Sequence, residues 1–170
     1  MRRTVIGGSA CPPAMMRAFQ QRYDVQVLHA WGMTEMSPVG TVCTLKPKHQ
    51  RLDAEQRMAV QAKQGRAVFG VDMKIVSDDG TELPHDGKAS GELMVRGPWI
   101  IASYFKGEGG SPLKDGWFPT GDVSTIDADG YIRIRGRAKR FAKLGGEMVS
   151  LAAVEAMAAE IWPQAVSVVV

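Results

Sequence analysis

The stretch that decides the fold runs from Gly116 to Ser150 and reads GWFPTGDVSTIDADGYIRIRGRAKRFAKLGGEMVS. Asp122 follows a Thr-Gly turn, so its carboxylate is expected to project from a bend in the chain. Behind it, the turn sequence at 127–130 and the alternation of isoleucine and arginine over 131–135 predict a tight β-hairpin. A basic segment over 136–140 and a Gly-Gly pair at 145–146 follow, and this order is more specific than any one of its parts.

The composition is typical of a soluble globular protein with one ordinary domain or two small ones. The chain has 170 residues, of which 45% are hydrophobic and 23% are charged. The formal net charge is +3, but the basic residues form no long run and match no nucleic-acid motif. The densest basic cluster, from Arg133 to Lys143, is equally consistent with a solvated strand and loop. We therefore expect no nucleic-acid partner.

The cysteines and the chain ends give expectations about location. Cys11 and Cys43 have neither metal-ligand spacing nor a disulfide framework, which fits the reducing cytoplasm. No apolar run reaches the about 18 residues of a membrane span, and no apolar stretch follows the charged start, so neither a span nor a signal peptide is expected. The apolar ending at 166–170 resembles a buried strand, and we expect the chain to be part of a longer protein.

The first 64 residues carry the pattern of an α/β unit with a parallel sheet. A strand at Thr4–Ile6 is followed by a glycine turn, a helix from Pro13 to about Arg22 and a second strand at Val25–His29. Parallel sheets bind ligands beyond the carboxyl ends of their strands, where Gly7–Ser9 and Trp31–Glu35 lie. A plain turn explains either segment alone, whereas two such turns at adjacent strand ends favour a binding site.

The predicted secondary structure of the rest of the chain changes twice. Residues 36–48 are predicted to be irregular and 53–64 to form a polar helix that begins at an Asp N-cap. Strands are predicted at 71–76, 91–96, 117–120, 123–126 and 131–135, forming a small antiparallel sheet or barrel, with a helical or extended segment at 100–105. A helix over 151–161 and a strand over 165–170 start a further unit. We expect three parts: an α/β part at 1–64, a barrel-like part at 65–136, and a hinge with the start of a small α+β domain at 137–170.

Four groups of side chains together describe a site for a nucleoside monophosphate. A carboxylate such as Glu35 can hold Mg²⁺, and the neighbouring Thr34 hydroxyl can take a phosphate oxygen. Trp31 offers a flat face for a base, Asp122 can accept hydrogen bonds from a ribose diol, and Arg137 can bind ribose or phosphate. Each group also has a structural alternative: Trp31 as a core residue, Asp122 as a turn cap and Arg137 in a surface ion pair.

These motifs resemble the adenylate-forming superfamily of acyl-CoA synthetases, adenylation domains and luciferases. The resemblance covers essentially the whole chain and rests on four segments in the family's order and spacing: Gly7–Ala10, Trp31–Glu35, Gly116–Asp122 and the run from Gly136 to Glu147. The run HAWGMTEMSP from His29 looks most like medium-chain fatty-acid–CoA ligases. The run RAKRFAKLGGEMVS from Arg137 looks more like acyl–acyl-carrier-protein synthetases, so both coenzyme A and a carrier protein stay open as thiol acceptors.

The resemblance implies that ATP and Mg²⁺ activate a medium- or long-chain fatty acid as an acyl-adenylate, and that a thiol then displaces AMP. It gives Thr34 and Glu35 catalytic roles, with Thr34 at the phosphate and Glu35 on Mg²⁺. The residues that it places around the nucleotide are Gly8, Ser9, Ala10, Trp31, Gly32, Met33, Thr34, Asp122 and Arg137. It also implies a domain hinge at Lys139 and a thiol tunnel lined by Gly145, Gly146 and Glu147.

Some expected features of the family are absent from the sequence. No Ser/Thr/Gly-rich phosphate loop occurs, and no residue matches the family's C-terminal catalytic lysine. Arg140 stands where many relatives carry an acidic residue, and Phe141-Ala142 replaces the usual aliphatic pair. We therefore expect an isolated chain that binds nucleotide poorly and turns over little. His29 is expected either near the acyl pocket or as a structural histidine, and a non-catalytic module completed by a partner at an exposed sheet edge is the other alternative.

Overall fold

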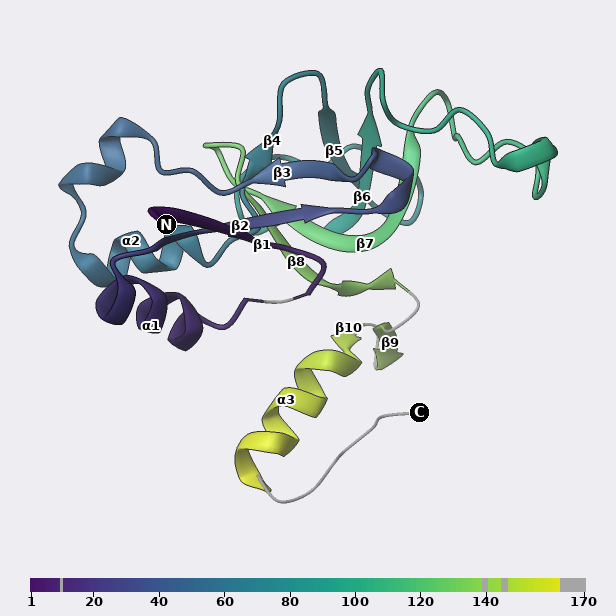
Figure 1. Cartoon of the computed structure of the whole chain (residues 1–170). Coiled ribbons are helices and arrows are strands. Elements are labelled where there is room, and N and C mark those ends of the chain that lie inside the picture. Colours follow the sequence, from purple (N-terminus) through teal and green to yellow (C-terminus); the bar gives the residue numbers. More distant parts are fainter. Residues whose placement is uncertain (10, 139–140, 145–146, 163–170) are drawn as a thin grey trace.

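The computed structural model describes residues 1–9, 11–138, 141–144 and 147–162 (Figure 1). Its first sheet has the order β1-β2-β3-β4. The strands are β1 (Arg3–Ile6), β2 (Gln26–Gly32), β3 (Val39–Val42) and β4 (Arg66–Ala67). Only β1 and β2 are parallel, because β2 pairs antiparallel with β3, and β3 with β4. The predicted parallel sheet is therefore right for the first pair only, and the segment predicted to be irregular contains the short β-branched strand β3.

Two helices pack beside the first sheet. Helix α1 (Pro13–Tyr23) starts after Pro12, because a proline in the first turn loses no intrahelical hydrogen bond. Helix α2 (Ala54–Gln61) begins at the predicted Asp53 cap, whose carboxylate accepts a hydrogen bond of 2.8 Å from the Gln56 amide. The buried residues of this layer come from both helices, from β2 and from the turn before α1. They are Cys11, Met16, Val27 and Met58.

The second sheet is antiparallel throughout and has the order β5-β6-β7-β8. Its strands are β5 (Asp72–Val76), β6 (Gly91–Arg96), β7 (Phe118–Ile126) and β8 (Ile132–Arg137). The two strands predicted at 117–120 and 123–126 form one long strand, β7. Gly121 has a φ of +71° inside this strand, and the register with β8 shifts just after it, so the strand bends without ending.

Hydrogen bonds between distant segments hold the two sheets together. Gly65 forms a bridge to Ile132 of β8, and the Gln64 side-chain oxygen accepts a bond of 2.8 Å from the Ile134 amide. Tyr131, which is almost completely buried, donates its hydroxyl to the Thr44 carbonyl at 2.7 Å. Buried apolar residues continue across this junction: Met36, Val71, Ile75, Leu93, Val95, Phe118, Ile126 and Ile132.

A cluster of opposite charges also ties the β7–β8 turn to the first part of the chain. Asp129 in this turn lies 3.1 Å from the Lys46 ammonium and 2.6 Å from that of Lys48. Asp127 at the start of the turn lies 2.6 Å from the Lys63 ammonium. The hairpin predicted from the sequence is therefore present, and the carboxylates of its turn hold it against the first part of the chain through ion pairs.

The described part of the chain also contains three 3₁₀ helices, η1 (Thr34–Met36), η2 (Pro47–Arg51) and η3 (Phe105–Gly107). η3 lies in the long connection between β6 and β7, which projects from the second sheet (Figure 1). Beyond β8, β9 (Phe141–Leu144) pairs antiparallel with β10 (Glu147–Ser150), and α3 (Leu151–Ile161) covers the predicted helix. The strand predicted over 165–170 lies outside the described residues. No helix within the described ranges is long and apolar enough to cross a membrane.

Candidate functional site

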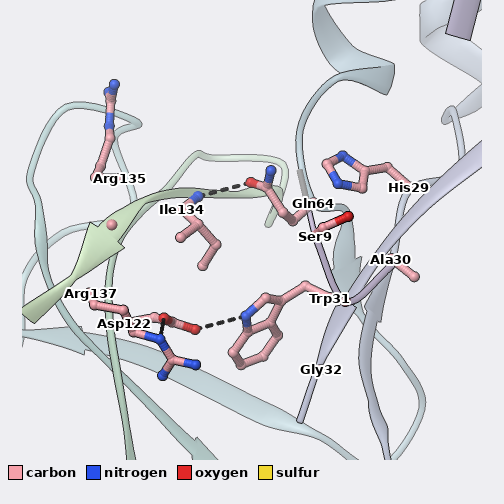
Figure 2. Close-up of a pocket in the computed structure, with 12 residues that line it drawn as sticks. Ser9, His29, Ala30, Trp31, Gly32, Gln64, Asp122, Ile134, Arg135 and Arg137 are labelled. Atoms are coloured by element: carbon pink, nitrogen blue, oxygen red, sulfur yellow. Dashed lines mark hydrogen bonds and ion pairs between the residues drawn. The ribbon is translucent and has the colours of Figure 1, made fainter. Parts of the chain in front are cut away.

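A cavity of about 330 Å³ lies where the carboxyl end of β2 meets β7 and β8. We call it the central cavity. The first sheet supplies one wall and the second sheet supplies the other, so residues far apart in the sequence meet across it (Figure 2). It is lined by Gly8, Ser9, His29, Ala30, Trp31, Gly32, Gln64, Asp122, Ile134, Arg135, Gly136 and Arg137.

The Asp122 carboxylate is held between an indole and a guanidinium (Figure 2). The Trp31 Nε1–H donates to Oδ2 at 2.9 Å, and the Arg137 Nε lies 3.1 Å from Oδ1. The Asp122 side chain is only 8% exposed, whereas Arg137 remains half in solvent. Each carboxylate oxygen has two acceptor positions, and Trp31 and Arg137 each use one of them on a different oxygen. The structure thus brings together three of the residues that the sequence assigned to base and sugar.

The backbone around Asp122 is fixed by its own side-chain neighbours. The buried Thr120 hydroxyl accepts a bond from the Asp122 amide at 3.1 Å and donates to the Leu93 carbonyl at 2.8 Å. Arg137 also donates from Nη1 to the Thr120 carbonyl at 3.0 Å. With Gly121 in a left-handed conformation between them, the Thr-Gly-Asp segment bends in the way the sequence predicted. Asp122 bonds through its carboxylate to side chains from β2 and β8, so it does not act merely as a turn cap.

Trp31 borders a second cavity of about 360 Å³ as well. This apolar cavity is lined by Val5, Gly7, Gly8, Ala30, Trp31, Gly32, Met33, Thr34, Pro38 and Val39. Gly8, Ala30, Trp31 and Gly32 line both cavities, so the two cavities are neighbours at the end of β2. Gly32 allows the Pro38 backbone to approach β2 closely, because a Cβ there would lie 1.8 Å from the Pro38 carbonyl oxygen. Trp31 also packs against the core, so the same side chain contacts the core and borders both cavities.

Thr34 and Glu35 begin η1 beside the apolar cavity. The Tyr104 hydroxyl donates to Glu35 Oε1 at 3.0 Å, and the Ile101 amide donates to the Glu35 carbonyl oxygen at 3.0 Å. The bond from Tyr104 is the main reason that the pKa of this tyrosine is raised, since the phenolate would face a carboxylate. Thr34 and Glu35 offer hard oxygen ligands, the chemistry that Mg²⁺ prefers. In the described part of the chain no three His, Cys, Asp or Glu residues gather as a metal site, but Mg²⁺ commonly takes only one or two carboxylates.

Six residues that line the central cavity were not assigned to the site from the sequence alone: His29, Ala30, Gln64, Ile134, Arg135 and Gly136. His29 is almost fully buried, lines the central cavity and places Nδ1 3.3 Å from the Ala62 carbonyl oxygen. It is absent from the residues that line the apolar cavity. Gln64 lies at the cavity because its side-chain oxygen accepts a hydrogen bond from the Ile134 amide of β8. These two residues are 70 positions apart, so no local sequence pattern reveals the contact.

Of the other predicted site residues, Gly8 and Ser9 are exposed and line the central cavity, and Met33 borders the apolar cavity. Glu147 is the first residue of β10. Ala10, Lys139, Gly145 and Gly146 lie outside the described residues. The predicted hinge and thiol tunnel therefore remain predictions.

Comparisons with known proteins identify relatives of the chain. Over 158 residues it is 51% identical to a 3-methylmercaptopropionyl-CoA ligase of Ruegeria lacuscaerulensis, and the match covers 93% of this chain and 29% of that ligase. It is 50% identical over 156 residues to a medium-chain-fatty-acid–CoA ligase of Ectopseudomonas oleovorans, with 92% and 29% covered. The chain thus spans about 29% of the length of these relatives.

Solved structures of CoA ligases and synthetases also resemble the chain. An O-succinylbenzoate coenzyme A synthetase from Bacillus subtilis in complex with AMP has a TM-score of 0.75 at 26% identity, with 94% of this chain and 31% of that chain covered. An anthranilate CoA ligase in complex with anthranoyl-AMP has a TM-score of 0.71 at 28% identity, with 91% and 28% covered. The family described as AMP-binding enzyme matches residues 1–105, which is more than half of the sequence. The chain therefore belongs to the AMP-binding enzyme family.

Proposed function

We propose that this chain forms the ribose- and acyl-binding end of an AMP-forming acid–thiol ligase. In the reaction, the oxygen of a fatty-acid carboxylate attacks the α-phosphorus of ATP and pyrophosphate leaves. The sulfur of coenzyme A then attacks the acyl carbon, and AMP leaves with the bonding electron pair. Because the chain spans 29% of its relatives, we propose this activity for a complete enzyme and infer that these 170 residues alone turn over little.

The observation that carries the proposal is the clamped Asp122 carboxylate. It is buried, opens into a cavity next to an aromatic ring, and keeps one acceptor position on each oxygen. A vicinal diol fits such a carboxylate, since its two hydroxyl groups can donate to the two oxygens. Trp31 then faces the base, and Arg137 adds a cation beside the sugar and phosphate.

The apolar cavity supports an acid with a short or medium apolar chain. It shares lining residues with the central cavity, Gly32 among them, and is bordered by aliphatic side chains such as Val5 and Val39. A substrate carboxylate at these shared residues would lie between the acyl space and the nucleotide space. The two ligases compared above are named for 3-methylmercaptopropionate and for medium-chain fatty acids, both of which fit this description.

The polar residues at the start of η1 are proposed to serve the phosphate. The Thr34 hydroxyl would bind an α-phosphate oxygen, and Glu35, oriented by Tyr104, would hold Mg²⁺. When bound, the metal neutralises phosphate charge during the attack. We further propose that Lys139 acts as the hinge between the two half-reactions and that Gly145, Gly146 and Glu147 line the thiol path. Coenzyme A is proposed as the acceptor because both of these relatives are CoA ligases.

Titration of the 170-residue chain with AMP by calorimetry tests this proposal. Asp122→Asn is expected to weaken binding about tenfold or more, because it removes the charge that strengthens the hydrogen bonds to the diol. The control Asp115→Asn makes the same change in charge at an exposed residue away from both cavities. Equal affinities of the two variants for AMP would contradict the proposed site. Octanoate-dependent ATP–pyrophosphate exchange by the chain alone would contradict its inferred low turnover.

A further inference from the structure

The hydrogen bond from Trp31 to Asp122 carries an inference about nucleotide selectivity. We propose that Trp31 is a positioning residue whose indole N–H fixes the Asp122 carboxylate for a vicinal diol, so that the site selects ribonucleotides over nucleotides without these hydroxyls. The inference rests on the proposed function and adds a second role to a side chain whose ring faces the base. It starts from two atoms, Trp31 Nε1 and Asp122 Oδ2, that lie 2.9 Å apart although 91 residues separate them.

The chemistry of indole restricts what this nitrogen can do. An indole nitrogen is a donor only and carries a single hydrogen. That hydrogen is donated to the Asp122 carboxylate, so the polar effect of the indole on a sugar passes through this acceptor. Figure 2 shows the indole, the carboxylate and the Arg137 guanidinium in one continuous line of bonds along the cavity.

The two donors determine how the carboxylate is turned. Rotation about the last torsion of an aspartate is soft, so a free carboxylate would present many orientations to a ligand. Here Trp31 binds Oδ2 while Arg137 binds Oδ1, and the Thr120 hydroxyl holds the Asp122 backbone. The remaining acceptor position on each oxygen then has a fixed direction. Two adjacent hydroxyls can use both positions at once, whereas one hydroxyl can use only one.

Because Asp122 is buried, the hydrogen bond from the Trp31 indole matters for the orientation of its carboxylate. The Asp122 side chain is only 8% exposed, so water cannot readily replace a donor that is removed. Arg137 alone would leave Oδ2 without its partner and the carboxylate free to turn about the single remaining ion pair. Trp31→Phe is therefore an informative change, because it keeps an aromatic face for the base and removes only the N–H and part of the ring.

The test measures the dissociation constants of AMP and 2′,3′-dideoxy-AMP for the 170-residue chain and for two variants. Trp31→Phe is compared with Trp99→Phe, a change at a tryptophan that lines neither cavity. The unchanged chain is expected to prefer AMP by about tenfold or more, and Trp31→Phe is expected to reduce that preference about tenfold. Trp99→Phe is expected to retain the preference. If Trp31→Phe weakens both nucleotides by the same factor, stacking alone explains the residue and the inference is overturned.

A second readout needs no ligand. Nitrogen-15 spectra resolve the indole N–H signals of the tryptophans, and the Trp31 signal is the one that Trp31→Phe removes. Asp122→Asn is expected to shift the Trp31 signal, and Asp115→Asn is expected to leave it unchanged. A Trp31 signal that is also unchanged in Asp122→Asn would overturn the inference. Failure of the unchanged chain to bind either nucleotide would overturn the proposal that this chain carries the ribose site. Binding without any preference for AMP would overturn only the positioning of the diol.

Discussion

Tyr104 and Glu35 form a pair whose interaction can be measured directly at the scale of single residues. The Tyr104 hydroxyl donates to a Glu35 oxygen, and this bond raises the pKa of the phenol. Glu35→Gln is expected to lower the Tyr104 pKa back towards its ordinary value, because a neutral amide no longer repels the phenolate. Ultraviolet titration of the phenols measures the change, with Tyr104→Phe to assign the signal and Glu55→Gln as a control far from Tyr104. An unchanged Tyr104 pKa in Glu35→Gln would show that the pair is not formed in solution.

Single residues also show where sequence reasoning stops. The types and order of Trp31, Asp122 and Arg137 indicated a sugar and base site, and the structure places the three in contact. The bond between Trp31 and Asp122 had no signal in the sequence, since it depends on how two sheets meet. Tyr104 was not singled out for the same reason, because it reaches Glu35 from a connection 69 residues away.

The junction between the two sheets can be tested at the scale of elements through glycines. Gly65 has a φ of +95°, and a Cβ there would lie 2.2 Å from the Val42 carbonyl carbon. Gly80 has a φ of +85°, but a Cβ there would meet nothing within 4 Å. Gly65→Ala is therefore expected to lower the free energy of unfolding by about 3 kcal/mol or more, and Gly80→Ala by about 1–2 kcal/mol. Urea denaturation measures both, and similar losses would mean that the backbone at Gly65 is not tightly packed.

Elements with a strong local pattern were predictable, and those fixed by distant partners were not. The helix at α2 and the strand β6 have clear boundaries in the sequence, namely an Asp cap and a Gly-Pro stop. Strand β3 escaped prediction because its four residues include Gly40 and become a strand only by pairing with β2 and β4. β7 was divided in two because Gly121 is a turn signal locally, whereas its neighbours on both sides keep the strand paired.

The charge cluster at the β7–β8 turn gives the whole molecule a dependence on acid. Hydrogen bonds from Lys48 and then Lys46 lower the pKa of Asp129 to about 2, against about 3.9 for an unfolded aspartate. A lowered pKa stabilises the fold above the unfolded value, and this contribution is lost as the pH falls from about 4 towards 2. Asp129→Asn is expected to lower the melting temperature by roughly 2–4 °C at pH 7 and to weaken its fall on acidification.

Thermal melts from neutral pH down to about pH 2 measure this effect, with Asp115→Asn as the control of equal charge change. Parallel curves for the original chain and Asp129→Asn would exclude the cluster as a source of the acid dependence. At the scale of the whole molecule, the sequence motifs predicted the family correctly, while the division into 1–64, 65–136 and 137–170 remains a prediction. Sequence motifs identify a family through residue types, but domain limits depend on packing between segments.

The long separations within the cavity have a consequence for how the protein is made. Trp31 bonds to a residue 91 positions later, and Tyr131 bonds to a residue 87 positions earlier. At about 5–20 residues per second, a ribosome delivers Asp122 roughly 5–18 seconds after Trp31. During that interval the first sheet has no opposite wall and cannot hold a nucleotide in the proposed way. A nucleotide that bridges the two walls would therefore stabilise only the docked arrangement, and its binding would signal that both walls have been made and have come together.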